Sequence, residues 1–445
     1  MAEIKRSLPI GVQSFEKLIE ADFLYIDKTK YIWDLINNRS PYFLSRPRRF
    51  GKSLFLSTLK AYFLGQKELF KGLAIEALEE GEKDKREIWQ EYPVLYLDFN
   101  TAVYESRQDL INILSSFLGQ YETIYGSTGL DITDRFKKLI SAAHEKTGKQ
   151  VVILIDEYDK PLLSSMENLS LNETYRTILK GFYGVIKSSD ASLRFAFLTG
   201  VTKFSKVSIF SDLNNLRDIS LLPDFSAICG ITENELKSSF YSEITALAEA
   251  NDLSEESAFL KLKQKYDGYC FSERGTSVYN PFSLLNVFAG KVFRDFWYAT
   301  GTPTFLVKYL KEGCYYIPEL DGDIQIDEYG LNAYRADPIL PIPILFQAAV
   351  YLIFALMNQF VQTEIHCAAG RADCIVHTQD RIYIFEFKLN GKGTAEEAIA
   401  QIKEKGYAAP YKEISTGETK KSILAVGASF DEEKRTIKDW CTEEL

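Results

Sequence analysis

The sequence lacks several features that would assign a class of protein at once. It has six cysteines but no Cys-x-x-Cys pair, and its three histidines are His144, His366 and His377. This spacing argues against a structural zinc site and against a disulfide framework. No internal repeat or low-complexity segment stands out in the 445 residues.

Long apolar segments and excess positive charge are also missing. The longest apolar run, Ala348 to Met357, is far shorter than the roughly 20 residues that span a bilayer. Residues 1–6 lack the apolar core of a signal peptide. We therefore expect a cytoplasmic protein with reduced thiols and no membrane contact. The net charge of −10 argues against a protein that coats nucleic acid generally, so any such contact requires local basic patches.

The length and the pattern of apolar residues indicate two or three domains. Apolar content of 46% is typical of a well-packed soluble protein. Residues 8–222 alternate apolar strands with amphipathic helices, as in a parallel α/β sheet; one strand is expected near 92–99 and a helix near 110–121. Residues 232–311 are predicted to be helical. After an irregular stretch rich in Tyr, Pro and Gly, a separate α/β unit is expected from about 346 to the C-terminus.

A strand–loop–helix passage over residues 42–63 has the features of a nucleotide-phosphate cradle. Such a loop needs converging backbone N–H groups, a Lys that reaches the β- and γ-phosphates, and a hydroxyl for Mg²⁺. The pattern G-x-x-x-x-G-K-[ST] is complete except that Arg46 replaces the first Gly, and Pro47 should make the loop turn differently at its entry. The alternative is a helix N-terminus with an ordinary surface Lys. The predicted nucleotide-binding residues of this loop are Arg48, Arg49, Phe50, Gly51, Lys52 and Ser53.

An acidic strand end, Asp156-Glu157, strengthens the prediction of a nucleotide site. Residues 151–155 form a continuous β-branched apolar run, as expected for a parallel strand buried on both faces. At the carboxyl end of such a strand, the first carboxylate can hold Mg²⁺ and the second can polarise the attacking water. The alternative is that Asp156 and Glu157 belong to a solvated turn after a core strand. A third strand over 194–198 leads into Thr199, which fits a residue that senses the γ-phosphate or one that caps the next turn.

A second group of charged residues lies near the C-terminus. Residues 371–378 and 381–388 predict two strands joined by a tight turn at Gln379-Asp380, and counting outward from the turn pairs Asp373 with Glu386. Directly opposed residues have Cβ atoms about 4.5–5.5 Å apart, so these carboxylates repel unless a divalent cation compensates. Lys388 falls on the same face by the two-residue period of a strand. Three aromatic residues are predicted to point to the other face, into the core: Tyr383, Phe385 and Phe387.

Two carboxylates and an ammonium on one face are the groups that a metal-assisted phosphodiester hydrolase needs. The metal would activate water and neutralise the phosphate, and the Lys would orient water or stabilise charge. Glu364, on a strand over 361–365, is a candidate third acidic ligand. The helix from Ala395 offers Gln401 and Lys405, with Tyr407 close behind. The alternative is an exposed hairpin that carries a Glu–Lys surface pair.

These motifs together resemble the bacterial AAA-ATPase-like family, whose members carry a C-terminal domain similar to PD-(D/E)XK nucleases. The resemblance rests on RPRRFGKS at 46–53, LIDEYDKPL at 154–162 and LTGVTKFSK at 198–206. The segments YIDKT, YDGY, YNPF and TGTPT, which begin at 25, 266, 279 and 300, fit as well. The resemblance covers nearly the whole chain, and members of the family also have Arg at the position of Arg46. By this resemblance the nuclease motif positions are Asp373, Glu386 and Lys388, with Glu364 before them and Gln401 on the helix.

The predicted fold is therefore α/β: a P-loop NTPase parallel sheet with a helical lid, followed by a small α/β PD-(D/E)XK nuclease-like domain. The expected boundaries are 1–225, 226–335 for the lid or connector, and 336–445. The expected activity is ATP binding and hydrolysis with ATP and Mg²⁺, coupled to a metal-dependent nuclease acting on DNA or RNA. The predicted catalytic residues are Glu157, Asp373, Glu386 and Lys388, and the predicted metal ligands are Ser53, Asp156, Glu364, Asp373 and Glu386.

Other functions and one departure from the family stay open at this point. One alternative is a nucleotide-dependent switch whose inactive nuclease-like domain only binds nucleic acid or a protein partner. A small-molecule kinase fits less well, since nothing resembles an acceptor site. Arg217 is considered as a phosphate-facing cation, against a surface-helix Arg. The stretch before the nuclease-like domain is shorter than in the family, and the sequence leaves the oligomeric state open.

Overall fold

The computed structural model shows two compact units. It describes residues 6–38, 40–165, 168–201, 215–266, 269–272, 276–294, 296, 324–325, 360–367, 370–377, 381–389, 393–411, 421–431 and 436–445. The first unit comprises the chain up to Ile231 together with Glu235–Ser239, and the second contains the later helices and the C-terminal sheet. In the part of the chain so described, no helix has the length and apolar character needed to cross a membrane.

A five-stranded parallel sheet forms the centre of the first unit, in the order β2-β3-β4-β1-β5. Buried apolar residues dominate its inner strands, as expected for a sheet covered on both faces. The parallel sheet predicted from the sequence is thus confirmed. Its strands are β1 (Tyr42–Ser45), β2 (Val94–Asp98), β3 (Val151–Asp156), β4 (Leu193–Gly200) and β5 (Arg217–Asp218).

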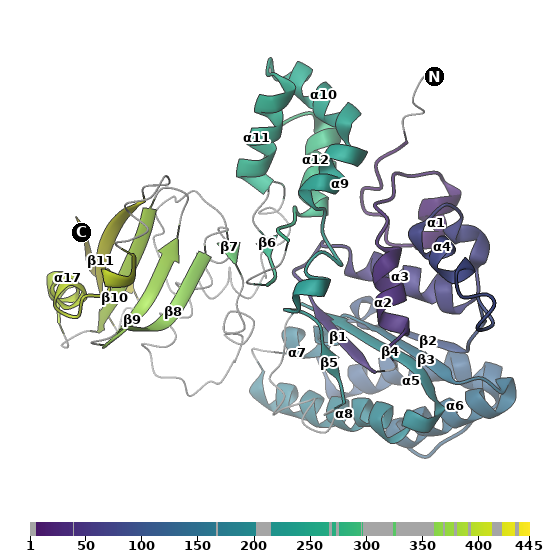
Figure 1. Cartoon of the computed structure of the whole chain (residues 1–445). Coiled ribbons are helices and arrows are strands. Elements are labelled where there is room, and N and C mark those ends of the chain that lie inside the picture. Colours follow the sequence, from purple (N-terminus) through teal and green to yellow (C-terminus); the bar gives the residue numbers. More distant parts are fainter. Residues whose placement is uncertain are drawn as a thin grey trace. The chain divides into compact units, whose positions relative to one another are not determined.

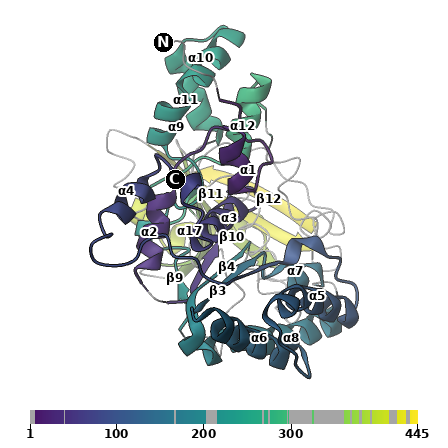
Figure 2. The same cartoon turned by 90° about the vertical axis from the view of Figure 1, so that its right-hand side faces the viewer.

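Helices cover both faces of this sheet (Figure 1). One face packs against α5 (Arg107–Tyr125), α6 (Ile132–Thr147) and α8 (Leu169–Ser188), which lie side by side in Figure 2 as well. Their packing includes stacked rings of Phe136 and Phe182, with centroids 4.4 Å apart. The other face carries α3 (Lys52–Phe63). Other helices in the described part of this unit are α1 (Phe15–Glu20), α2 (Thr29–Ile36), α4 (Ala74–Glu80), α7 (Lys160–Ser164) and the 3-10 turns η1 (Lys67–Phe70), η2 (Phe99–Thr101), η3 (Asp190–Ser192) and η4 (Pro223–Phe225).

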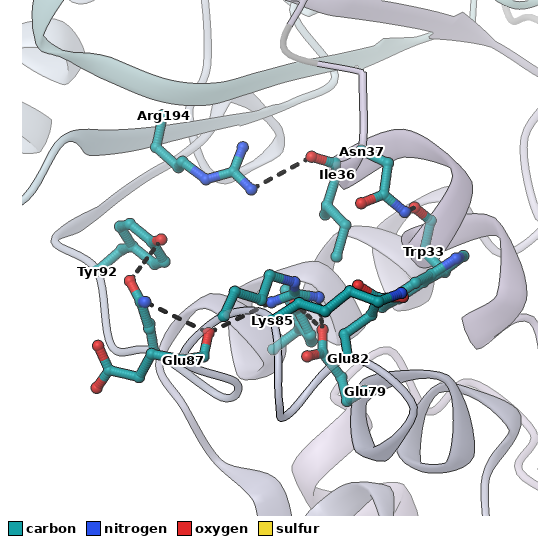
Figure 3. A network of polar contacts seen from close by, with 12 residues as sticks. Trp33, Ile36, Asn37, Glu79, Glu82, Lys85, Glu87, Tyr92 and Arg194 are labelled. Atoms are coloured by element: carbon teal, nitrogen blue, oxygen red, sulfur yellow. Dashed lines mark hydrogen bonds and ion pairs between the residues drawn. The ribbon is translucent and has the colours of Figure 1, made fainter.

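Two arginines attach α2 and the loop after α4 to the rest of the unit. Arg194 of β4 donates to the carbonyl oxygen of Ile36 at 3.2 Å, at the end of α2 (Figure 3). Arg86 binds the fully buried Glu79 at 2.9 Å and lies 5.4 Å over the ring of Trp33. Because Tyr62 of α3 also donates to Glu79, this carboxylate joins α3 and α4.

A helical region follows the first sheet, as the sequence predicts. It consists of α9 (Glu233–Ser239), α10 (Tyr241–Ala250), α11 (Glu255–Tyr266) and α12 (Pro281–Gly290). Asn280 caps α12 by accepting from the N–H of Ser283 at 3.0 Å, and Pro281 occupies the first helical turn, where its missing N–H is tolerated. Two short strands, β6 (Tyr269–Cys270) and β7 (Ile324–Gln325), form a parallel pair.

The C-terminal part is a five-stranded mixed sheet in the order β12-β11-β10-β9-β8. In its central hairpin Tyr383 pairs with Val376 and Phe385 with Cys374, which confirms the predicted register. The predicted turn at 379–380 lies outside the described residues. The strands are β8 (Phe360–Cys367), β9 (Gly370–His377), β10 (Arg381–Leu389), β11 (Ser422–Asp431) and β12 (Thr436–Glu444).

The predicted burial of the aromatic face of β10 is confirmed in part, since Phe385 is buried there with its ladder partner Cys374. A further buried cluster forms on the face of Ile382 and Ile384, which pack with Ile399 and Ile402 of α17 (Ala395–Glu404). The aromatic residues 383, 385 and 387 lie on the opposite face, with Tyr383 and Phe387 only half-buried. Sequence alternation separates two faces of a strand but does not say which one a helix covers. Glu386 and Lys388 therefore lie on the face that α17 covers.

Gly427 allows α17 to approach the sheet closely. It pairs with Glu386 across β11 and β10. A Cβ atom at this position would lie 2.0 Å from the carbonyl oxygen of Ala395. The absence of a side chain thus brings the start of α17 next to the charged end of β10. The 3-10 turn η5 (Ala409–Tyr411) follows α17.

Candidate active sites

Arg46 ties the entry of the phosphate loop to the segment that follows β5. Its guanidinium is buried and donates to the carbonyl oxygens of Ser45 at 2.9 Å, Ser220 at 2.6 Å and Phe225 at 3.0 Å. Burial lowers the pKa of Arg46 to about 10, and nearby Cys229 and Asp218 offset part of this effect. Arg46, which occupies the position of the usual first Gly, thus fixes the start of the loop to the segment after β5.

The loop closes around the ammonium of Lys52. Lys52 is 4% exposed, and its Nζ lies 3.0 Å from the carbonyl oxygen of Arg46 and 3.2 Å from Oε1 of Glu157. Two residues of the loop have left-handed backbone conformations, Arg49 with φ 69° and Gly51 with φ 94°. Only Gly adopts the second without strain, and Gly51 caps the N-terminus of α3. The alternative of an ordinary surface Lys is therefore excluded by its burial.

Asp156 lies beside the start of α3 at the carboxyl edge of the sheet. It is 2% exposed and accepts hydrogen bonds from the hydroxyls of Thr199 and Ser53. Burial raises its pKa, those two hydroxyls lower it, and the charge of Glu157 raises it again. Glu157 has φ 52°, a conformation that costs a residue with a side chain on the order of 1–3 kcal/mol and often marks functional sites.

Asp98, at the end of β2, is a site residue that the sequence reasoning missed. It pairs directly with Asp156 in the parallel ladder, so both carboxylates lie on the face that α3 covers. Burial raises the pKa of Asp98, and the charges of Asp156 and Glu157 add to this. The signal was present in the sequence, because Asp98 ends an apolar strand just as Asp156 does.

The other predicted residues of this site have different environments. Arg48 and Arg49 are half-buried, while the side chain of Phe50 is buried. Thr199 is fully buried against Asp156. The suggestion that Arg217 faces phosphate was wrong, since it lies in β5 beside Tyr42, at the opposite end of β1 from the loop.

In the C-terminal sheet, Glu386 is the centre of a buried polar cluster. It is 5% exposed, and its Oε1 accepts from Gln401 of α17 and lies 3.4 Å from Nζ of Lys388. Lys388 also donates to Oε1 of Gln401, and the Gln401 amide lies 3.4 Å from the hydroxyl of Tyr407. Burial and the charge of Asp373 raise the pKa of Glu386 to about 7, against the effects of Lys388 and Gln401. An exposed surface pair is therefore excluded.

The strand registers bring three acidic positions into one row. The hairpin ladder ends with Phe385 paired to Cys374, so Glu386 and Asp373 follow this last pair on the two strands, and Asp373 accepts from the N–H of Phe387 at 2.8 Å. In the β8–β9 ladder Thr363 pairs with Cys374 and Ile365 with Ala372, which places position Glu364 opposite Asp373. Glu364, Asp373 and Glu386 thus occupy neighbouring backbone positions on three adjacent strands.

The donor atoms fit a divalent cation at both sites. The buried Oε2 of Glu386 has no hydrogen-bond partner among the residues that the structure describes. A buried carboxylate oxygen without a partner is costly, and a cation or a proton removes that cost. At the first site Ser53 and Asp156 supply the hydroxyl and carboxylate oxygens that Mg²⁺ prefers. Within the described residues no group of three Asp, Glu, His or Cys side chains is arranged to hold a metal by itself.

Fold and site together define a P-loop ATPase-like protein joined to a nuclease-like domain. Residues 9–210 match the family model described as predicted AAA-ATPase, and residues 345–440 match the PD-(D/E)XK nuclease superfamily. The chain belongs to this family of predicted AAA-ATPases with a C-terminal nuclease-superfamily domain.

Two individual proteins are similar to this chain. An uncharacterized protein in the vnfD 5′ region of Azotobacter chroococcum mcd 1 is 33% identical over 537 aligned positions, covering 99% of both chains. The alignment exceeds the 445 residues of this chain by 92 positions, so this chain is the shorter of the two. The Aeropyrum pernix ORC2 structure, with ADPNP and ADP, covers 81% of this chain and 89% of its own at 14% identity and a TM-score of 0.24. This structural likeness is too low to carry an argument.

Proposed function

We propose that the first unit binds and hydrolyses ATP, with Mg²⁺ as cofactor. The observation that carries this proposal is the row of polar groups at the carboxyl ends of β1, β4, β3 and β2, with Lys52 held inside the loop. Mg²⁺, when bound, neutralises phosphate charge. Ser53 and Asp156 would hold it, and Thr199 would orient Asp156.

Lys52 and Glu157 pair with each other before nucleotide binds and act separately afterwards. Phosphate oxygens would replace the Glu157 carboxylate as partner of Nζ, which lies only 3.2 Å from Glu157. Glu157 is then free to accept a proton from the attacking water. Backbone N–H groups of residues 48–53, at the start of α3, would bind the phosphates. In this proposal Arg48 and Arg49 add positive charge at the loop.

Glu157→Gln tests the assignment of the base. The variant should bind ATP about as tightly as the wild type but turn it over roughly tenfold or more slowly, because the amide cannot accept the proton. Glu145→Gln, an exposed carboxylate on α6, is the matched control. Wild-type turnover in Glu157→Gln would exclude Glu157 as the base.

We further propose that the C-terminal sheet is a metal-dependent nuclease domain that acts on DNA or RNA in the cytoplasm. This part is carried by Glu386, which is buried, has an oxygen without a hydrogen-bond partner among the residues that the structure describes, and lies near Asp373. The cation, when bound, supplies charge neutralisation at the scissile phosphate. Asp373, Glu386 and Glu364 would hold it, Gln401 orients Glu386, and Lys388 stabilises developing negative charge.

Metal binding tests this second part before any substrate is known. Calorimetric titration of the full chain with Mn²⁺ should show a site that Asp373→Asn weakens roughly tenfold or more, because one carboxylate ligand is lost. Asp439→Asn, an exposed residue on β12 of the same sheet, should leave that site unchanged. Equal titrations for Asp373→Asn and wild type would remove the proposed metal site.

A further inference from the structure

The segment that follows β5 lies directly against the phosphate loop. We call residues Ile219 to Glu235 the strap. The N–H of Ser45 donates to Oγ of Ser220 at 2.8 Å, and Arg46 reaches the carbonyl oxygens of Ser220 and Phe225. The N–H of Gly230 donates to the carbonyl oxygen of Phe50 at 3.2 Å. The strap therefore contacts the loop at its entry and again next to Gly51.

The far end of the strap is held by a partly buried ion pair. Nζ of Lys28 lies 2.7 and 2.8 Å from the two carboxylate oxygens of Glu235 on α9. The side chains are 10% and 27% exposed. Lys28 immediately precedes α2, and Asp27 beside it accepts from the N–H of Ala74 at 2.7 Å, at the start of α4. The pair thus joins the strap to the start of α2, which Asp27 also links to α4.

Charges of both the ion pair and the phosphate loop act on Cys229 of the strap. Cys229 of the strap is buried, which raises its pKa, and three cations act on it in the opposite direction: Arg46, Lys52 and Lys28. Lys28 therefore shares one charged region with the lysine of the loop. Lys28 pairs with the strap carboxylate of Glu235 in a bidentate contact. A change in that contact alters both the closure of the strap and the field at the loop.

We propose that Lys28 and Glu235 are positioning residues of the nucleotide site, which rests on the proposed ATP binding. Their ion pair holds the strap against the phosphate loop, supports the backbone at Phe50 through Gly230 and slows nucleotide release. Because coupling between two equilibria is reciprocal, bound nucleotide strengthens the closure of the strap and so protects α9 from opening. The pair thereby couples nucleotide binding at the loop to the stability of α9, the first helix of the helical region.

The test uses the full chain with a fluorescent N-methylanthraniloyl-ADP as the probe. Release is measured by stopped flow in Lys28→Met, Glu235→Gln and the exchange of both charges, Lys28→Glu with Glu235→Lys. Hydrogen exchange of peptides over 219–239 is measured with and without ADP-Mg²⁺. Glu233→Gln is the matched control, because Glu233 lies on the same helix but pairs with the more exposed Lys263 at 2.9 Å.

Release should be roughly tenfold faster in both single variants, close to wild type in the charge exchange, and unchanged in Glu233→Gln. ADP should protect 219–239 in the wild type and much less in the single variants, while β3 exchanges equally in all, which shows that they fold. Release within twofold of wild type in both single variants would overturn the role of this pair and leave ATP binding intact. A wild type that binds no nucleotide would instead overturn the proposed function and this role with it.

Discussion

Replacing Glu386 by Gln should stabilise the C-terminal sheet at pH 8 and leave it unchanged at pH 4. Burial and the neighbouring Asp373 raise the pKa of Glu386 from 4.5 to about 7 in the folded protein. Since one pKa unit corresponds to about 1.4 kcal/mol, the ionised carboxylate lowers the free energy of unfolding by about 3 kcal/mol above pH 7. The folded state binds more protons than the unfolded state between pH 4.5 and 7, so wild-type stability falls as pH rises through this window. Gln does not titrate, and its stability stays level there.

Pulse proteolysis in urea measures this difference in the full chain, through fragments that contain β10. The experiment is run without metal at pH 4, 6 and 8, with Glu404→Gln, an exposed carboxylate on α17, as the control. Added Mn²⁺ should restore wild-type stability at pH 8 and have little effect on Glu386→Gln, because the cation compensates the ionised carboxylate. Parallel pH curves for wild type and Glu386→Gln would refute the reasoning.

Three further substitutions test other parts of the structure. Lys52→Ala removes a charge-assisted contact worth about 1.5–3 kcal/mol, so calorimetry should show ATP affinity reduced roughly tenfold or more; equal affinity would exclude a phosphate role. Asp98→Asn should raise the Mg²⁺ concentration for half-maximal ATP turnover by roughly threefold or more, since one of three adjacent carboxylates is neutralised. An unchanged Mg²⁺ dependence would place Asp98 outside the site. Glu79→Gln should lower the free energy of unfolding by about 2 kcal/mol or more, as Arg86 loses its buried partner, and denaturation that matches the wild type would contradict this.

Much of the fold follows from short-range rules that leave few alternatives. The run Val151 to Ile155 has no polar residue and can only be a strand buried on both faces. The hairpin register follows from counting, because a tight turn fixes every pair behind it. The same counting places Glu386 opposite Asp373, and the ladder between β9 and β10 has that register.

What the sequence could not show depends on contacts between distant segments. The sequence did not show that α17 covers the face of Ile382 and Ile384, since that depends on the close approach at Gly427. Arg46 looked like a change in a phosphate-binding pattern, yet it binds carbonyl groups 174 and 179 residues away. The pair of Lys28 and Glu235 joins residues 207 positions apart, and no local pattern marks it.

A cleavage assay on DNA and RNA, with Mn²⁺ or Mg²⁺ and with or without ATP, tests the coupling of the two activities most directly. The wild type should cleave at least one of these nucleic acids only with metal, and the rate should change when ATP is added. Asp373→Asn should abolish cleavage and keep ATP turnover, while Lys52→Ala should remove the effect of ATP. No cleavage by a wild-type protein that turns over ATP would contradict the account, and would assign the C-terminal sheet to binding of nucleic acid or a protein partner.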